Sequence, residues 1–341
     1  MKTTSKITFS QMMKTTITML ATKRSYLLAI GVLAGSPAAS ALEFYGEINM
    51  SRQEITEDGE TYSDIRSNGS AIGVMEERAL NRGVSAEFLL EYEIMPNQPV
   101  ASSGGSYEQD PLTLSAGYVG LIGSAGKLKI GYFATPLKIL GEDIDHFTDL
   151  RGDKARYITT GDVDISNAFM YTSPEWRGLT ARISHVSYET SPDEESMEDE
   201  RSNGVSVSVS YEYGDMFTGI AYDSEVEGEE IDLFRAVARY PLGPVNIGVL
   251  WERRKDNNAD NTTSGWLASA TAPVTENVSL QFQHGRSDNV AEGGRATSLG
   301  ATYDLGNDVS LYVFATDNTS DDTSGELGDE SEYGLGISYV F

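Results

Sequence analysis

A long acidic segment between residues 136 and 164 holds the side chains whose types and spacing could do chemistry. Glu142, Asp143, Asp145 and Asp149 lie close together in the chain, beside His146. A histidine held by a carboxylate can act as a general base in hydrolysis. Clustered carboxylates can also attract cations without any catalysis. Cysteine is absent from the chain, which excludes thiol catalysis and Cys-zinc sites.

The overall charge narrows the class of partner. The formal net charge is −27, and residues 42–341 carry −32 because residues 1–41 hold five basic and no acidic residues. Such a chain repels phosphate, so we expect no nucleic-acid partner. We expect no cofactor and no built metal site, because the acidic runs lack the spacing of a calcium-binding loop. The runs at Asp193–Glu195, Glu198–Glu200 and Asp321–Asp322 are candidates only for weak, diffuse binding of Ca²⁺ or Mg²⁺.

The elements that must position the acidic segment are β-strands. Segments that alternate apolar and polar residues recur along the chain, each near the length that a tilted membrane strand requires. We expect sixteen of them, near residues 43–54, 67–78, 84–95, 112–123, 127–135, 165–174, 179–190, 204–213, 216–226, 231–241, 245–255, 264–274, 278–288, 296–305, 309–318 and 331–341. An even number lets both termini lie on one side of the membrane.

The connections between these strands alternate between short turns and longer polar loops. The expected long loops cover residues 55–66, 96–111, 191–203, 227–230, 256–263, 289–295 and 319–330, together with the acidic segment 136–164. Short turns on one side and long loops on the other are typical of outer-membrane barrels. Because the acidic segment is long, we expect a function for it, and residues 136–140 could form a helical turn there.

The two ends of the chain support export to an outer membrane. Residues 1–41 combine basic residues, the short apolar run Tyr26–Ala34 and the ending Ala39-Ser40-Ala41, a pattern that predicts a cleaved signal peptide. The last strand places Tyr339 and Phe341 on its apolar face. A terminal Phe resembles the signal that the barrel-assembly machinery reads in Gram-negative outer-membrane proteins, so we assign that role to both aromatic residues. An amphipathic strand of a soluble sandwich would show the same alternation.

Several motifs resemble the general bacterial porins, which are trimeric sixteen-stranded diffusion channels. They are Phe44–Glu47, Ile72–Val74, Ile130–Pro136, Asn167–Leu179 and the ending Tyr333–Phe341. The resemblance implies an all-β fold, a 16-stranded antiparallel transmembrane β-barrel formed by residues 42–341. It also implies a homotrimer and a third loop folded into the lumen as a constriction, which we assign to Glu142, Asp143, Asp145 and Asp149.

The chain departs from this family at the lumen wall. General porins face their acidic third loop with a ladder of basic residues, whereas the matching positions here hold Glu47, Ala71, Tyr132 and Asp164. We therefore expect Glu47, Tyr132 and Asp164 to line the wall. Some of the lost positive charge could be replaced by Arg182, and also by Arg66, Arg235 and Arg239. An acidic lumen predicts a preference for cations over anions.

The sequence thus predicts a non-enzymatic porin in the Gram-negative outer membrane. We expect passive diffusion of small hydrophilic solutes and ions, and contact with outer-membrane lipid that includes lipopolysaccharide. Three alternatives stay open at this point: a substrate-selective channel, a non-conducting surface barrel that serves as an adhesin or phage receptor, and a barrel hydrolase that uses His146.

Overall fold

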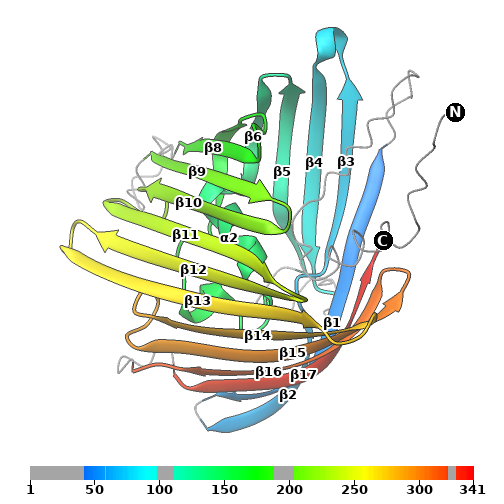
Figure 1. Cartoon of the computed structure of the whole chain (residues 1–341), viewed down its shortest axis with the longest axis vertical. Coiled ribbons are helices and arrows are strands. Elements are labelled where there is room, and N and C mark those ends of the chain that lie inside the picture. The colour runs from blue at the N-terminus through cyan, green and yellow to red at the C-terminus, as the bar shows by residue number, and fades with distance from the viewer. Residues whose placement is uncertain (1–41, 58, 98–110, 188–202, 322–327) are drawn as a thin grey trace, which may run out of the picture. The chain divides into compact units, whose positions relative to one another are not determined.

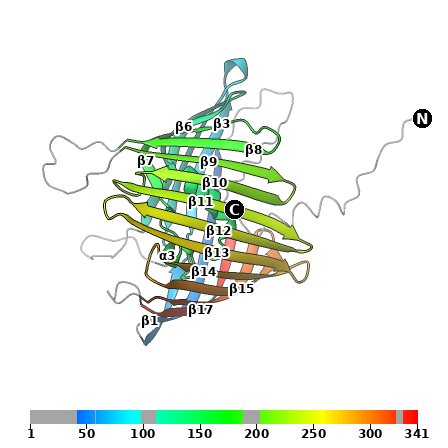
Figure 2. The same cartoon turned by 60° about the vertical axis from the view of Figure 1, so that its left-hand side comes forward.

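The strands of residues 42–341 form one antiparallel sheet that closes on itself. The computed structural model describes residues 42–57, 59–97, 111–187, 203–321 and 328–341, so the expected signal peptide and the acidic runs at 193–200 lie outside the described residues. Neighbouring strands pair in chain order, and the last strand pairs back with the first. Figure 1 shows this succession of strands, and Figure 2 shows β8 to β15 lying beside one another in order.

Each of the sixteen expected strands has an observed counterpart in the described chain. The strands are β1 (Glu43–Glu57), β2 (Glu60–Ser67), β3 (Ala71–Ala79), β4 (Ser85–Ile94), β5 (Leu112–Gly123), β6 (Gly126–Ala134), β7 (Asp164–Thr172), β8 (Leu179–Val186), β9 (Gly204–Tyr213), β10 (Met216–Ser224), β11 (Ile231–Leu242), β12 (Val245–Asp256), β13 (Asn261–Pro273), β14 (Val278–Ser287), β15 (Gly294–Gly306), β16 (Val309–Thr319) and β17 (Glu330–Val340). A single 3-10 turn, η1 (Asn81–Gly83), joins β3 to β4.

β2 and β3 together make one membrane-crossing strand, which gives the expected sixteen. β1 pairs with β2 along its second half and with β3 along its first half. Between them, the backbone N–H of Asn68 donates to the carbonyl of Asn49 at 2.9 Å, and the N–H of Asn49 donates to the Ser70 hydroxyl at 2.9 Å. These bonds satisfy the backbone groups where the regular ladder is interrupted.

Two of the expected long loops are wrong. Residues 55–66 continue β1 and β2 as a paired hairpin, with Glu57 opposite Glu60. The loop expected at residues 256–263 is shorter than predicted, because β12 and β13 extend into it and place Asp256 opposite Asn261. Both faces of these stretches are largely polar, with only Ile55, Tyr62 and Ile65 apolar in the first of them. No regular apolar alternation marks them, although the backbone still pairs.

The strands present apolar side chains outward and polar side chains inward. On β17, Leu335 and Tyr339 are exposed on one face, whereas Glu330 and Glu332 are buried on the other. The same alternation on β9 buries Ser206 and Ser208 and exposes Val205 and Val209. An apolar outer face against lipid and a polar inner face are what a membrane barrel requires.

The C-terminal residue completes the closure of the barrel. The Phe341 N–H donates to the Gly46 carbonyl at 3.0 Å, and the Gly46 N–H donates to the Phe341 carbonyl at 2.9 Å. The Phe341 ring packs beside Tyr339 and lies so close to Gly46 that a Cβ there would be 2.7 Å from the ring. Tyr339 and Phe341 are therefore placed on the outer face, and their role as an assembly signal stays a prediction.

The third loop, which joins β6 to β7, contains three short helical elements. They are α2 (Pro136–Gly141), the 3-10 turn η2 (Glu142–Ile144) and α3 (Lys154–Tyr157). Thr135 caps α2 by accepting the N–H of Lys138 at 3.0 Å, and Pro136 starts the helix. The expected helical turn at residues 136–140 is thereby confirmed. Among the described residues, no helix is long and apolar enough to cross a membrane.

Candidate functional site

The third loop packs against the inner wall of the barrel through an apolar core. Leu137, Leu140 and Ile144 of the loop are fully buried against wall residues that include Leu233 and Leu250. Figure 1 shows α2 behind the strands β10 and β11, in keeping with the contacts between these elements. The burial of this core fixes one face of the loop and so determines which loop side chains can face the lumen.

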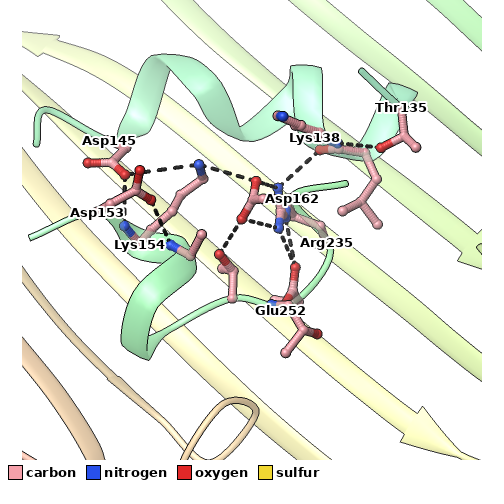
Figure 3. A network of polar contacts seen from close by, with 12 residues as sticks. Thr135, Lys138, Asp145, Asp153, Lys154, Asp162, Arg235 and Glu252 are labelled. Atoms are coloured by element: carbon pink, nitrogen blue, oxygen red, sulfur yellow. Dashed lines mark hydrogen bonds and ion pairs between the residues drawn. The ribbon is translucent and has the colours of Figure 1, made fainter. Parts of the chain in front are cut away.

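Arg235 of β11 is the polar anchor of the loop. Its side chain is fully buried and joins Asp162 of the loop to Glu252 of β12 (Figure 3). The guanidinium donates to Asp162 at 2.9 and 3.2 Å, to Glu252 at 2.9 and 2.5 Å, and to the Leu137 carbonyl at 3.2 Å. All five of its N–H groups are therefore used.

Lys154 and Asp145 organise the middle of the loop. The Lys154 ammonium lies 3.2 Å from Asp162, and burial, which alone would raise the pKa of Asp162, is outweighed by the charges of Arg235 and Lys154, which hold that pKa well below its usual range. The buried Asp145 carboxylate accepts the N–H groups of Phe147 and Lys154, both at 2.8 Å. Asp145 thus turns inward to hold the loop together.

The far end of the loop is bound to β17 and β1. Arg151 and Arg156 both pair with the buried Glu330, and Arg151 also reaches Glu57 at 3.2 Å. The Asn318 amide donates to the Arg151 carbonyl at 2.7 Å. With these contacts the loop is attached to the wall from β9 around to β1.

The four predicted constriction acids have different environments. Asp143 pairs with Arg239 of β11 at 2.8 Å, and Asp149 is exposed, with its N–H bonded to Asp153 at 3.0 Å. Glu142 is half-buried, and burial raises its pKa to about 7 against the opposing charges of Lys154 and Lys138. Glu142, Asp143 and Asp149 keep surface toward the lumen, whereas Asp145 does not.

His146 is not arranged as a catalytic base. Burial lowers the pKa of His146 to about 4, so the ring is neutral at physiological pH. Its Nε2 lies 2.9 Å from the Thr271 hydroxyl, and its backbone N–H donates to Gln283 at 3.0 Å. Since the Asp145 carboxylate is engaged by backbone N–H groups, the two side chains do not form the pair that a hydrolase would need.

The part of the wall across the ring from the loop anchor is acidic. By strand order, β3 and β4 lie opposite β11 and β12 in the closed sheet. There, Glu47 of β1, Ala71 of β3 and Glu93 of β4 stand side by side on the inner face. Glu47 accepts the Ser338 hydroxyl at 2.7 Å, and the neighbouring Glu91 accepts the hydroxyls of Tyr45 and Ser115 at 2.9 and 2.8 Å.

The basic part of the wall lies on β6 and β8. Lys127 pairs with Glu87 of β4 at 2.5 Å, and Lys129 lies over the rings of Tyr118 and Phe133 at 4.8 and 4.2 Å. Arg182 is on the same inner face, within electrostatic range of Glu212 and Glu142. Arg182 was expected in the wall from the sequence, whereas neither lysine was, although both share the inward parity of their strand.

Two predicted wall residues are placed elsewhere. Tyr132 pairs with Gly117 and shares the parity of Leu128 and Ile130, whose side chains are exposed on the outer face. Asp164 pairs with Lys138 at 2.6 Å at the start of β7, on the opposite side of the strand from the buried Ile165. Neither position contributes an acid to the lumen opposite the loop.

The sequence that forms this barrel and its inward loop matches a known protein family. The family model described as Gram-negative porin matches residues 27–339 of the chain. The chain belongs to the Gram-negative porin family. This porin is therefore an outer-membrane diffusion channel and not an enzyme.

Individual relatives agree with this assignment. The porin is 22% identical over 266 residues to a monosaccharide porin from a Halomonas species. The identity to the major outer membrane protein of Halomonas elongata is the same. Each of these alignments covers 69% of this chain and 70% of the relative. Its fold is similar to that of the anion-selective porin from Comamonas acidovorans, with 17% identity, a TM-score of 0.69 and coverage of 89% and 100% of the two chains. Salmonella typhi OmpF, solved with daunomycin, has 16% identity, a TM-score of 0.67 and coverage of 89% and 98%.

No metal centre is formed in the described part of this porin. Among residues 42–57, 59–97, 111–187, 203–321 and 328–341, no group of three or more His, Cys, Asp or Glu side chains is placed to hold a metal ion. Weak binding of Ca²⁺ or Mg²⁺ at the acidic runs stays a prediction, since those runs fall almost entirely outside these residues.

Proposed function

We propose that this porin is a cation-preferring channel for small hydrophilic solutes. The acidic row of Glu47 and Glu93 on either side of Ala71, across the ring from the loop anchor Arg235, carries the proposal. In a pore, acidic side chains raise the local concentration of cations and repel anions. Small neutral sugars fit the same function, in line with the name of the Halomonas relative.

The assembled state belongs to the same proposal. The porin works as a homotrimer after the barrel-assembly machinery has inserted it and residues 1–41 have been removed as a signal peptide. Family membership and the C-terminal aromatic strand support this. Glu142 and Asp143 narrow the pore from the loop side, while Asp145 acts indirectly by holding the loop in shape.

The ion preference is tested by the reversal potential of single channels in a tenfold KCl gradient. Dilute salt is needed, because the Debye length is about 30 Å at 0.01 M but only about 3 Å at 1 M. We expect wild-type porin to prefer K⁺, and the variant Glu142→Gln/Asp143→Asn to prefer it less, since two acids are lost and Arg239 then has no Asp143 carboxylate beside it. Asp149→Asn removes a single exposed loop acid and should lower the preference less than the double variant does. A wild-type channel that prefers Cl⁻ would refute the proposal.

The same preference should depend on pH. Burial raises the pKa of Glu142 to about 7, so the side chain is charged at pH 8.5 and neutral at pH 5.5. We expect the preference for K⁺ to fall as the pH drops through this range, because the lumen loses a negative charge. Reversal potentials at the two pH values measure the effect, and Glu142→Gln should make the curve flatter. An unchanged pH response in this variant would show that another group titrates.

A further inference from the structure

The ring of Tyr45 lies flat against the inner wall, beside the acidic row of Glu47 and Glu93. Tyr45 of β1 stands opposite Gly73 of β3, and Gly73 stands opposite Glu91 of β4. A Cβ atom on Gly73 would point into the lumen and lie 2.3 Å from Cζ of Tyr45, so the ring covers this glycine from the lumen side. One face of the ring therefore rests on β3, and the opposite face is turned toward the lumen.

Contacts at its hydroxyl hold the Tyr45 ring in this orientation. The hydroxyl donates to Glu91 at 2.9 Å, and the buried Glu91 carboxylate also accepts the Ser115 hydroxyl at 2.8 Å. Tyr45 is half-buried, so part of its side chain stays exposed. The ring face is thus in place before a solute arrives, and a solute that binds it does not have to order it.

Two carboxylates flank a small residue next to this ring. Ala71 lies two residues before Gly73 on the same face of β3, and Glu47 and Glu93 stand directly opposite Ala71 on its two sides. All three side chains are half-buried. Since directly opposite Cβ atoms on a sheet are about 5 Å apart, the two acids stand roughly 10 Å apart with only a methyl group between them.

The protein does not balance the charge of these two acids. Glu47 accepts the neutral Ser338 hydroxyl at 2.7 Å, and Lys127 of the basic wall is paired with Glu87 instead, at 2.5 Å. Within the part of the chain that the structure describes, no basic side chain forms an ion pair with Glu47 or Glu93. An exposed aromatic face therefore lies beside two carboxylates that have no cation of their own.

We propose that Tyr45, Glu47, Ala71 and Glu93 form a binding site for organic ammonium ions, of which quaternary ammonium compounds are the simplest class. The face of an aromatic ring is negative and attracts a cation placed over it, most strongly when the cation gives up its water. An alkylated ammonium ion is weakly hydrated and can place its methyl groups on Ala71 and on the ring. The inference rests on the proposed function, because the same acidic row supplies the charge, and it adds a selection among cations.

The test is the dissociation constant of choline, a quaternary ammonium ion, measured by ligand-observed NMR on purified porin in octyl glucoside at low salt. We expect Tyr45→Leu to bind choline about two- to fivefold more weakly than Tyr45→Phe, which is the fold-change that a cation over a partly exposed ring provides. Both variants lose the bond to Glu91, so the difference between them reports the ring face. The neutral isostere of choline, with carbon in place of nitrogen, should bind both variants equally weakly.

A second tyrosine provides the matched control. Tyr312 of β16 also lies over an inward glycine, Gly336, but its hydroxyl contacts the neutral amides of Asn49 and Asn68. Tyr312→Leu should therefore bind choline like the wild type. Equal binding of choline by Tyr45→Leu and Tyr45→Phe would overturn the proposal, as would an equal loss in Tyr312→Leu.

Reversal potentials in KCl distinguish this site from the general ion preference. Tyr45→Leu keeps Glu47 and Glu93, so its preference for K⁺ should equal that of wild-type porin. A wild-type channel that prefers Cl⁻ and does not bind choline would overturn the ion preference and the ammonium site together. A preference for K⁺ combined with equal choline binding by Tyr45→Leu and Tyr45→Phe would overturn the ammonium site alone.

Discussion

Replacing Arg235 by Ala is expected to release the third loop from the wall and widen the pore. The side chain is fully buried and is the shared partner of Asp162 and Glu252. Removing one member of a buried ion cluster leaves uncompensated charge, at a cost of about 3–5 kcal/mol. We therefore expect a higher single-channel conductance together with a lower unfolding temperature of the barrel in detergent.

Two comparisons show whether the buried charge is the cause. Arg239→Ala removes a pair with Asp143 that keeps about a quarter of each side chain exposed, and such pairs contribute only about 0–1 kcal/mol. This variant should change stability little. The triple variant Arg235→Met/Asp162→Asn/Glu252→Gln removes all three charges together and should be more stable than Arg235→Ala. Normal conductance and normal stability of the Arg235→Ala variant would contradict the anchoring role of Arg235.

The architecture of the barrel could be predicted from the sequence because lipid and water impose a period of two on every strand. The third loop could be predicted because its length is out of scale with the other connections. The hairpin at residues 55–66 could not, since polar side chains dominate both of its faces and its few apolar residues show no regular alternation. Backbone hydrogen bonds form there regardless of hydropathy.

The details of the lumen were only partly accessible from the sequence. Family positions pointed to Tyr132, yet its parity with Leu128 and Ile130 already indicates an outward direction. The same parity rule would have found Lys127 and Lys129. By contrast, the contact of Arg235 with Asp162 and Glu252 joins three distant segments, and no local pattern reports it.

Asp145 illustrates a second limit of the sequence. Its type and position match the other loop acids, but its carboxylate is used by the N–H groups of Phe147 and Lys154 inside the loop. Burial raises the pKa of Asp145, with repulsion from Asp153 in the same direction. Only the folded loop separates this structural acid from Glu142 and Asp143, which keep surface toward the lumen.

Reversing the charge of the acidic wall row is the most direct test of whether this row sets the ion preference. The variant Glu47→Lys/Glu93→Lys places two positive charges on either side of Ala71, where repulsion of cations should replace attraction. The control Glu54→Lys/Asp317→Lys makes the same charge change on the outer face. The measurement is the reversal potential in a tenfold KCl gradient at low salt. We expect a reversal potential of opposite sign for Glu47→Lys/Glu93→Lys and an unchanged sign for the control. A wall variant that still prefers K⁺ as strongly as wild-type porin would contradict the role of this row.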